Sequence, residues 1–431
     1  MITRRSRVTL TSVAIAMLAG SLLAGCGTGA VPAASSAPTA AAAVEAAVRS
    51  AKPTPSPAAT VVVTPPPLPS AAVSPAALPE QWPMFADAAL PKATAERLQA
   101  TLERLVGGTA AKGAAAAIVT PDGSWAGATG VDGAGKPIEP TSAFGIGSTS
   151  KTVTAAEILL LASQGKLDLD RPVADVVTLP FDAQGATVRQ LAAMQSGFPA
   201  GDDGDLAIEI AKDLDRAWTI DDMLEGVKNM PRAGTVGGPG HYNGINYQAL
   251  SRVIEQVTGK PLATALREDL LAPAGLDRMW TQIGEQPEAP LAVAVSPSAQ
   301  IVDASGGYLP SRAAASTGNG AAGIAADAPT LARWGYLLYG GRILEPAVLA
   351  PMMKPNWSSD FGYGFGSTFD NTSGELLVGH GGDYMGYSAM LLAWPETHTA
   401  VAILVPRQGM TIDGTVSGWA FELYKALAAG G

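Results

Sequence analysis

The stretch Phe144-Gly-Ile-Gly-Ser-Thr-Ser-Lys151 decides how the rest of the chain is interpreted. Two glycines precede Ser148 and disfavour helix, whereas residues 152–161 form an apolar run of good or tolerated helix formers. Ser148 is therefore predicted to lie at or just inside a helix N-terminus. Lys151 follows three residues later, which places it on the same helix face about one turn along.

This arrangement suits a nucleophilic serine. Free backbone N–H groups and the positive end of the helix dipole favour negative charge on the Ser148 oxygen. The Lys151 amine could take the proton of Ser148 or hold a hydrogen bond to it. The Ser-x-x-Lys pattern is weak by itself, because Ser163-Gln-Gly-Lys166 also matches it and reads as the end of a helix. Taken alone, Ser148 could equally be a helix cap and Lys151 a solvated lysine.

Composition excludes several classes of function. The chain has 431 residues, of which 47% are hydrophobic, so it can form one large domain or two. A net charge of -10 argues against a nucleic-acid partner, because phosphate contacts need clustered Lys and Arg. Three histidines and one cysteine are too few for a Cys/His zinc site. We expect neither a metal site nor a nucleic-acid interface.

The N-terminus is predicted to be a lipoprotein signal peptide, residues 1–25. A basic segment precedes the apolar residues 10–23, which are too short to span a membrane comfortably. The only cysteine, Cys26, directly follows Leu23-Ala-Gly25. This looks like a bacterial lipoprotein signal, in which Cys26 becomes the lipidated N-terminus; the alternative is a free buried cysteine. Export by the general or the twin-arginine route would fit, given Arg4-Arg5.

Lipidation predicts a protein anchored in the cell membrane on its extracytoplasmic face. Residues 26–80 are rich in Ala, Pro, Ser and Thr. Such a composition cannot build a packed core, so this segment is expected to be an extended, largely disordered tether. The globular domain would then span residues 81–431.

The globular part predicts an α+β fold. An amphipathic helix over 92–106 precedes a hairpin of strands 114–120 and 124–129, joined by Pro121-Asp122-Gly123. The chain ends with strands over 387–394 and 399–405 and a helix over 415–428. The economical packing is one antiparallel sheet from both chain ends, with helices on its faces and a mostly helical insert at about 162–325.

Within the insert, capping residues mark several helix starts. Thr187 and Gln190 form a capping box, Thr219 is an expected N-cap, and Asp327 is expected to cap a helix that runs through Leu338. Residues 287–323 are rich in Ala, Ser, Pro and Gly, and we expect loops there.

Two further motifs follow the serine stretch. They are Tyr242-Asn243-Gly244 and His380-Gly381-Gly382. With three motifs in this order, the chain from about Leu98 to its end resembles the serine β-lactamase-like hydrolases. That family includes class C β-lactamases, serine D-Ala-D-Ala carboxypeptidases and related esterases. The resemblance implies a β-lactamase/penicillin-binding-protein-like fold and no cofactor, and it specifies no oligomeric state.

The resemblance also implies roles for individual residues. Ser148 would attack a carbonyl and become acylated, while Lys151 and Tyr242 would share the general-base work. Tyr242 would need cationic neighbours to lower its pKa, which Lys151 and His380 could supply. The backbone N–H groups of Ser148 and Asp383 would form the oxyanion hole. The remaining motif residues, expected to bind substrate, are Asn243, Gly244, His380, Gly381 and Gly382.

One position departs from the family pattern. The third residue of the tyrosine motif usually carries a side chain that can hydrogen-bond, often Asn, but here it is Gly244. We therefore expect esters to be better substrates than β-lactams. The candidate substrates are cell-wall D-Ala-D-Ala peptides, β-lactams and small esters. The rival hypothesis is a catalytically weak envelope-binding lipoprotein that retains the fold, with Tyr242 and His380 as ordinary packing residues.

Overall fold

The computed structural model describes residues 80–201, 203–295, 299–359, 362–371 and 375–429. The predicted signal peptide, Cys26 and the tether up to residue 79 lie outside these ranges. Within them, none of the helices has the length and apolar character needed to cross a membrane. The same residues contain no group of three or more His, Cys, Asp or Glu side chains that could hold a metal ion.

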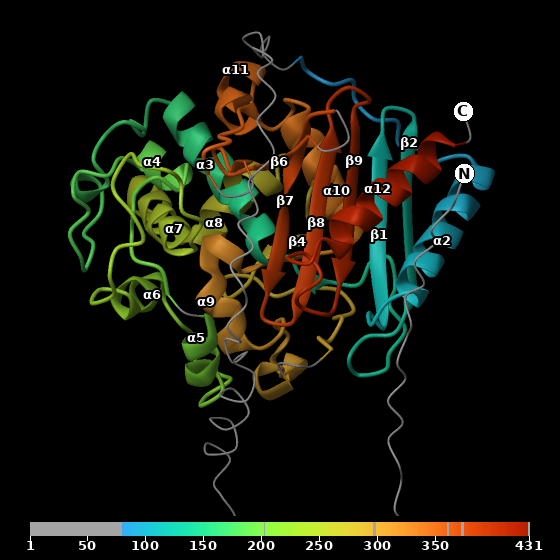
Figure 1. Cartoon of the computed structure of the whole chain (residues 1–431), viewed down its shortest axis with the longest axis horizontal. Coiled ribbons are helices and arrows are strands. Elements are labelled where there is room, and N and C mark those ends of the chain that lie inside the picture. Colours follow the sequence, from blue (N-terminus) through green and yellow to red (C-terminus); the bar gives the residue numbers. More distant parts are fainter. Residues whose placement is uncertain (1–79, 202, 296–298, 360–361, 372–374, 430–431) are drawn as a thin grey trace, which may run out of the picture.

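A six-stranded antiparallel sheet contains strands from both ends of the chain, as predicted. The strand order is β2-β1-β9-β8-β7-β6 (Figure 1). The pairing of β1 with β9 joins the N-terminal hairpin to the C-terminal strands. The strands are β1 (Gly113–Thr120), β2 (Gly123–Gly130), β6 (Thr368–Asp370), β7 (Leu377–Tyr384), β8 (Tyr387–Trp394) and β9 (Thr399–Val405).

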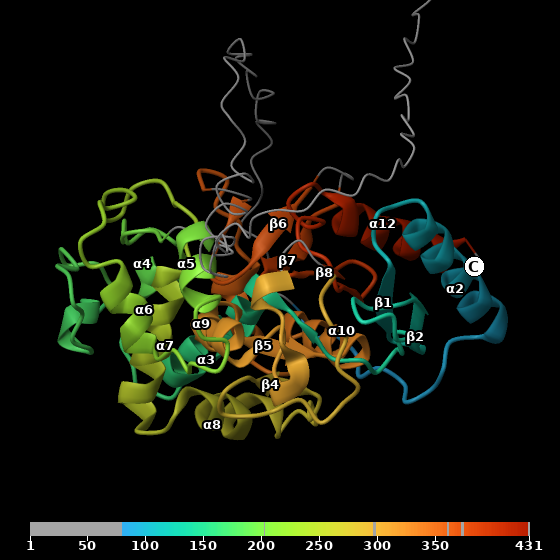
Figure 2. The same ribbon diagram turned by 90° about the horizontal axis from the view of Figure 1, so that it is seen from below.

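Both faces of the sheet are covered by helices. In β9, Val401 and Ile403 pack into the core under α2 (Lys92–Gly107) and α12 (Thr415–Ala428). The alternate residues, Ala400 and Ala402 among them, face the second core under α10 (Ala328–Tyr339). Alternation is required because successive strand residues point to opposite faces. Figure 2 shows α12 and α2 on one side of the sheet and α10 on the other.

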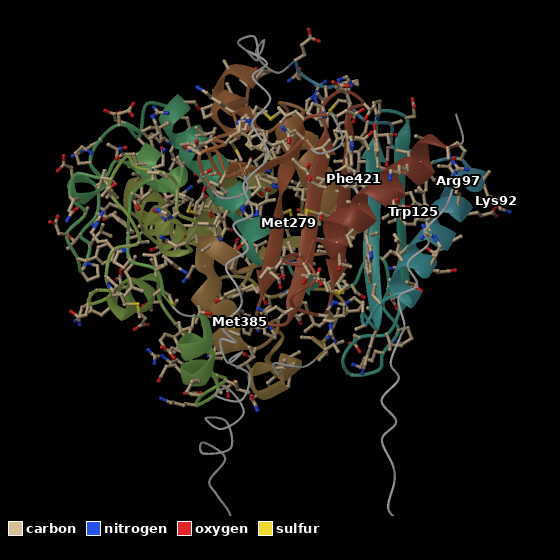
Figure 3. The ribbon with its side chains drawn as sticks, viewed as in Figure 1. Lys92, Arg97, Trp125, Met279, Met385 and Phe421 are labelled. Carbon is tan, nitrogen blue, oxygen red and sulfur yellow. The ribbon has the colours of Figure 1, made fainter. Side chains whose placement is uncertain are left out.

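The outer helices are held to the sheet and to each other. Trp394 of β8 stacks on Tyr424 of α12 with ring centroids 4.3 Å apart. It also meets the edge of Phe421, labelled in Figure 3, at 5.8 Å. Arg97 of α2 donates a hydrogen bond of 2.6 Å from Nε to the carbonyl of Ala426. These contacts fix the two terminal helices as one layer.

A mostly helical part lies beside the sheet, at the left of Figure 1. Its central helix, α3, is buried from Ser150 to Leu159 and has no solvated face in that stretch. A helix that is buried on every side must be enclosed by other elements. Met385, at the β7–β8 turn and labelled in Figure 3, packs in one cluster with residues of α5 and α9. The helices are α3 (Ser150–Ser163), α4 (Val188–Ala192), α5 (Asp203–Ile210), α6 (Ile220–Gly226), α7 (Ile245–Thr258), α8 (Leu262–Leu266), α9 (Arg312–Ala322) and α11 (Pro346–Leu349).

The predicted helix starts are confirmed. Thr187 accepts from the backbone of Gln190, whose side chain accepts in return from Thr187 N–H. Thr219 forms the same box with Asp222. Asp327 accepts from Thr330 N–H at 2.8 Å. Each cap satisfies backbone donors that the helix itself leaves unpaired.

The prediction of loops over 287–323 is wrong at its C-terminal end. Helix α9 occupies this stretch, with Ser311 as its N-cap and a run of buried alanines as its first turn. Alanine is the strongest helix former, so the small-residue composition indicated helix here.

A second, three-stranded sheet was also not predicted. Its strands, in the order β3-β5-β4, are β3 (Phe144–Gly145), β5 (Ile324–Ala326) and β4 (Met279–Thr281).

The central helix carries a buried acid. Glu157 of α3 is fully buried next to the Asp269 carboxyl group. Burial, together with the nearby negative charge of Asp269, raises the pKa of Glu157 to about 8. An isolated buried charge is costly, so the side chain stays protonated at neutral pH.

Replacing Glu157 with glutamine is therefore expected to stabilise the protein increasingly as pH rises. The folded state keeps a proton on Glu157 that the unfolded state releases above about pH 4.5, so wild-type stability falls from there up to about pH 8. The gain for Glu157→Gln should grow by about 3 kcal/mol between pH 5.5 and pH 8.5. Urea unfolding of both proteins at pH 5.5 and 8.5 measures it. An equal difference at the two pH values would contradict the assignment.

Candidate active site

The serine stretch forms a tight turn that leads into α3. Strand β3 ends at Gly145, a 3₁₀ turn covers Gly147–Thr149, and α3 begins at Ser150. Lys151 Nζ lies 2.9 Å from Ser148 Oγ. Lys151 is only 2% exposed, whereas Ser148 is half-buried. The two side chains therefore meet as their spacing predicts, and Lys151 is not a solvated surface lysine.

Three hydrogen bonds fix the conformation and position of this turn. Gly147 has φ +52°, a conformation that favours glycine. Ser150 Oγ donates to the Gly147 carbonyl at 2.7 Å and accepts from Ile324 N–H at 3.2 Å. Thr149 Oγ1 donates to the His380 carbonyl at 3.2 Å. The polar residues that flank Ser148 thus tie the turn to both sheets.

A carbonyl that the sequence did not indicate completes the environment of Lys151. Its Nζ donates to Ala321 O at 2.8 Å. This carbonyl belongs to the last turn of α9, where Asn319 breaks the helix with φ 39° and ψ -135°. Thr154 of α3 donates to the neighbouring Gly320 carbonyl at 2.8 Å. The kinked end of α9 therefore directs two carbonyl groups at the serine helix; Gly318-Asn-Gly320 is the sole hint of it in the sequence.

Tyr242 lies next to this pair. Lys151 Nζ is 5.1 Å from the centroid of the Tyr242 ring. The Tyr242 hydroxyl is 3.4 Å from His380 Nε2. The edge of Tyr363 packs against Tyr242 with 5.4 Å between ring centroids. Three motifs that are far apart in the chain thus meet at one point.

His380 is a neutral hydrogen-bonding group. It is 2% exposed, and its Nδ1–H donates to the Gly381 carbonyl at 2.5 Å. Burial, and secondarily the charge of Lys151, lowers the pKa of His380 to about 3. A neutral imidazole with its proton on Nδ1 presents Nε2 as an acceptor, so the Tyr242 hydroxyl donates to it. The expectation that His380 could supply a positive charge to Tyr242 is therefore wrong.

The glycines of the third motif allow β7 to lie against the serine turn. A Cβ on Gly382 would overlap the carbonyl oxygen of Ile146, and it would be 3.1 Å from Thr149 Oγ1. A Cβ on Gly147 would be 3.1 Å from the backbone nitrogen of Asp383. The Asp383 backbone nitrogen therefore lies beside the serine turn.

The Asp383 carboxylate has a separate, structural set of partners. It accepts from the backbone N–H groups of Gly409, Thr411 and Ile412 at 2.6, 3.1 and 3.2 Å. These bonds attach the loop after β9 to the end of β7. Only the backbone of Asp383 is thus placed for a role next to Ser148.

Asn243 and Gly244 differ from each other in their surroundings. The Asn243 side chain is buried, donating to Phe198 O at 3.3 Å and accepting from Asn246 Nδ2 at 3.1 Å. Its amide is therefore committed to the fold. Gly244 precedes α7 with φ -69°, and a Cβ there would meet only Ala321 Cβ, at 3.9 Å. The space that a hydrogen-bonding side chain would occupy is open.

The motifs line one large cavity of about 1010 Å³. Ser148, Lys151, Tyr242 and His380 are all in its lining. The segment of α5 and α6 forms one wall of the cavity, which includes several large apolar side chains. Members of that wall are Leu206, Ile208, Trp218, Met223, Val227 and Met230.

A nucleophile, an amine, a hydroxyl and backbone donors in one cavity suit acyl transfer. The family model for Beta-lactamase matches residues 98–416. Among curated proteins, the chain is 25% identical over 231 residues to PbpX of Bacillus subtilis (strain 168), covering 52% of this chain and 54% of that protein. It is 30% identical over 156 residues to esterase EstB of Burkholderia gladioli, covering 33% and 39%. The matches thus span about half or less of these relatives.

The fold also matches solved structures. The D-amino acid amidase from Ochrobactrum anthropi SV3, complexed with L-phenylalanine amide, is 21% identical and has a TM-score of 0.66. The match covers 78% of this chain and 99% of the amidase. At this identity the likeness concerns the fold, whereas the family model covers most of the chain. The chain therefore belongs to the Beta-lactamase family of serine hydrolases.

Proposed function

We propose that the protein hydrolyses esters and amides through an acyl-enzyme on Ser148. The observation that carries this proposal is the distance of 2.9 Å between Lys151 Nζ and Ser148 Oγ inside the cavity. An amine at this distance can accept the serine proton or orient the hydroxyl for attack. The names of the relatives, an esterase and an amidase among them, agree with this chemistry.

In the proposed reaction each group has one part. Ser148 Oγ attacks the carbonyl carbon while its single proton passes to the neutral amine form of Lys151, which lies beside the protonated Tyr242 hydroxyl. The backbone N–H groups of Ser148 and Asp383 stabilise the negative oxygen that forms, an effect worth roughly 3 kcal/mol per donor. The proton then goes to the leaving group, and water later attacks the acyl-enzyme. Neutral His380 orients the Tyr242 hydroxyl by accepting its hydrogen bond.

Covalent labelling tests the proposal against its rival. A fluorophosphonate probe should modify the folded protein at a single serine, Ser148, and should block hydrolysis of p-nitrophenyl acetate. A folded protein that neither reacts with the probe nor hydrolyses the ester would favour the non-catalytic envelope-binding lipoprotein.

Adding a hydrogen-bonding side chain at Gly244 should broaden the substrate range. The helical φ of Gly244 and the open space beside it allow asparagine without strain. A hydrogen bond that forms as the serine attacks contributes about 1 kcal/mol, or roughly a five- to tenfold change in rate. Gly244→Asn should therefore speed acylation by a chromogenic β-lactam by that factor and leave an activated ester nearly unchanged.

The wild-type kcat/KM values on the ester and the β-lactam are the reference for Gly244→Asn. Gly107→Asn, at a position with nothing near its Cβ, controls for a new surface asparagine. We expect wild type to hydrolyse p-nitrophenyl acetate faster than the β-lactam. Equal efficiency on both substrates would show that another group already supplies the missing hydrogen bond.

The protein is further proposed to be a lipoprotein of the cell membrane, exposed on its extracytoplasmic side. The support is the sequence around Cys26, with a basic start, a short apolar segment and a small-residue cleavage site. Cys26→Ser should release the protein from the membrane fraction or leave it as a longer precursor, because no thiol remains to be lipidated. Fractionation and intact-mass measurement distinguish these states. Processing and partitioning identical to wild type would contradict lipidation.

A further inference from the structure

Acidic side chains outnumber basic ones in the lining of the active-site cavity. Five carboxylate side chains line it, whereas the described lining contains a single lysine or arginine, Lys151. The internal segments outside the described residues (202, 296–298, 360–361 and 372–374) contain no Lys or Arg in the sequence. The lining carboxylates are Asp205, Glu209, Asp222, Asp370 and Asp383.

From this distribution we propose that the site selects substrates without a free carboxylate: neutral or cationic esters and amides with an apolar group. The inference rests on the proposed hydrolase function and narrows its substrate class. It disfavours peptides with a free C-terminal carboxylate and carboxylate-bearing β-lactams among the candidate substrates. A carboxylate that enters a partly desolvated cavity needs a cationic or multiple hydrogen-bonding partner to offset lost hydration.

Lys151 is poorly placed to be that partner. Its Nζ already donates to Ser148 Oγ and Ala321 O, and the side chain is 2% exposed. A substrate carboxylate bound to Lys151 would compete with the reacting carbonyl for the same point in the cavity. His380 gives its Nδ1–H to Gly381 O and offers only an acceptor to the cavity, which a carboxylate cannot use.

Local partners moderate some of the negative charge without reversing it. Glu209 pairs with Lys212, and Asp222 pairs with Arg216 at 3.4 Å. Neither cation is among the lining residues, but Arg216 stacks on the lining Trp218, 3.5 Å from its ring centroid, and so offsets the charge of Asp222. Asp383 is held by backbone N–H groups, which add no net charge. Asp205 is exposed on α5.

Apolar side chains at the cavity favour an apolar substrate group. Trp218 and Met223 line its α5–α6 wall, and Met230 and Ile412 line it while being 36% and 83% exposed. Large apolar side chains exposed around a concave site are typical of surfaces that bind apolar ligands. The cavity therefore combines an apolar surface with a negative potential.

Three substrates that differ in one charge test the inference. They are p-nitrophenyl esters of phenylacetic acid with a para methoxycarbonyl, carboxylate or trimethylammonium group. The para position prevents the substituent from attacking the ester, and each kcat/KM is normalised to the rate with hydroxide. We expect the anionic ester to be at least about tenfold worse than the neutral one, and the cationic ester to equal or exceed it. The gap should shrink between about 20 and 500 mM salt because salt screens the charges.

A double variant tests whether the carboxylates of α5 cause the selection against the anionic ester. Asp205→Asn with Glu209→Gln should raise the ratio of kcat/KM for the anionic ester to kcat/KM for the neutral ester about two- to fivefold. The matched control, Glu96→Gln with Glu103→Gln, removes two charges from α2, away from the cavity. It should not change the ratio of kcat/KM between the anionic and the neutral ester.

The outcomes separate this inference from the function on which it rests. Ser148-dependent hydrolysis of the neutral ester with equal efficiency on the anionic one would overturn the charge selection alone. A cationic ester as poor as the anionic one would also overturn it, since size or hydration would then be the cause. Absence of any hydrolysis or probe labelling would overturn the proposed function and the inference together.

Discussion

Ser148→Ala is expected to abolish ester hydrolysis and probe labelling while the protein stays folded. The hydroxyl is the proposed nucleophile, and its oxygen lies 2.9 Å from Lys151 Nζ. We expect kcat to fall by roughly 10⁴-fold or more. Lys151→Met, which keeps the length of the side chain without its amine, should be nearly as damaging. The double variant should be no worse than either single one, because the two groups act as a unit.

The chain contains its own control for this experiment. Ser163 and Lys166 have the same spacing, but both are exposed at the end of α3, where Gly165 has φ +69°. Ser163→Ala with Lys166→Met should therefore leave kcat/KM and labelling unchanged. Circular dichroism and thermal unfolding confirm that each variant is folded, and mass spectrometry of the labelled peptide identifies the modified serine. An adduct on another serine, or an active Ser148→Ala protein, would refute the assignment.

Gly382→Ala is expected to inactivate the protein through geometry alone. The added Cβ would overlap Ile146 O, so β7 or the serine turn must move. Such movement would strain the bond from Thr149 Oγ1 to His380 O and displace the Asp383 N–H from Ser148. A displacement of about 1 Å in a catalytic group can cost about 10²-fold in rate, and overpacking costs about 1–3 kcal/mol of stability.

Gly418→Ala is the matched control for this change. Gly418 lies within α12, with no atom within 4 Å of its Cβ position. Alanine should stabilise that helix by about 0.5–1 kcal/mol and leave kcat/KM unchanged. Unfolding and kinetic measurements on both variants separate loss of the site from loss of the fold. Full activity in a folded Gly382→Ala protein would show that the fit of β7 to the serine turn is not required.

Features that depend on neighbouring residues could be predicted from the sequence. The capping residues Thr187, Thr219 and Asp327, the hairpin of β1 and β2 and the last strands all follow from local hydrogen bonding and side-chain alternation. The three-residue spacing of Ser148 and Lys151 likewise brings their side chains together on one helical turn. For such features the physical cause lies within a few residues of its effect.

Only the tertiary structure decided what surrounds these residues. No local pattern indicates that the Ala321 carbonyl binds Lys151, because that contact spans 170 residues and depends on the break at Asn319. The sequence around His380 does not show that this side chain is buried. Burial by segments distant in the sequence lowers its pKa and keeps the imidazole neutral. The two serine–lysine pairs have identical spacing, but one is enclosed by the fold and the other faces solvent. Spacing determined which groups can meet, and burial by distant segments decided which pair can serve as a catalytic site.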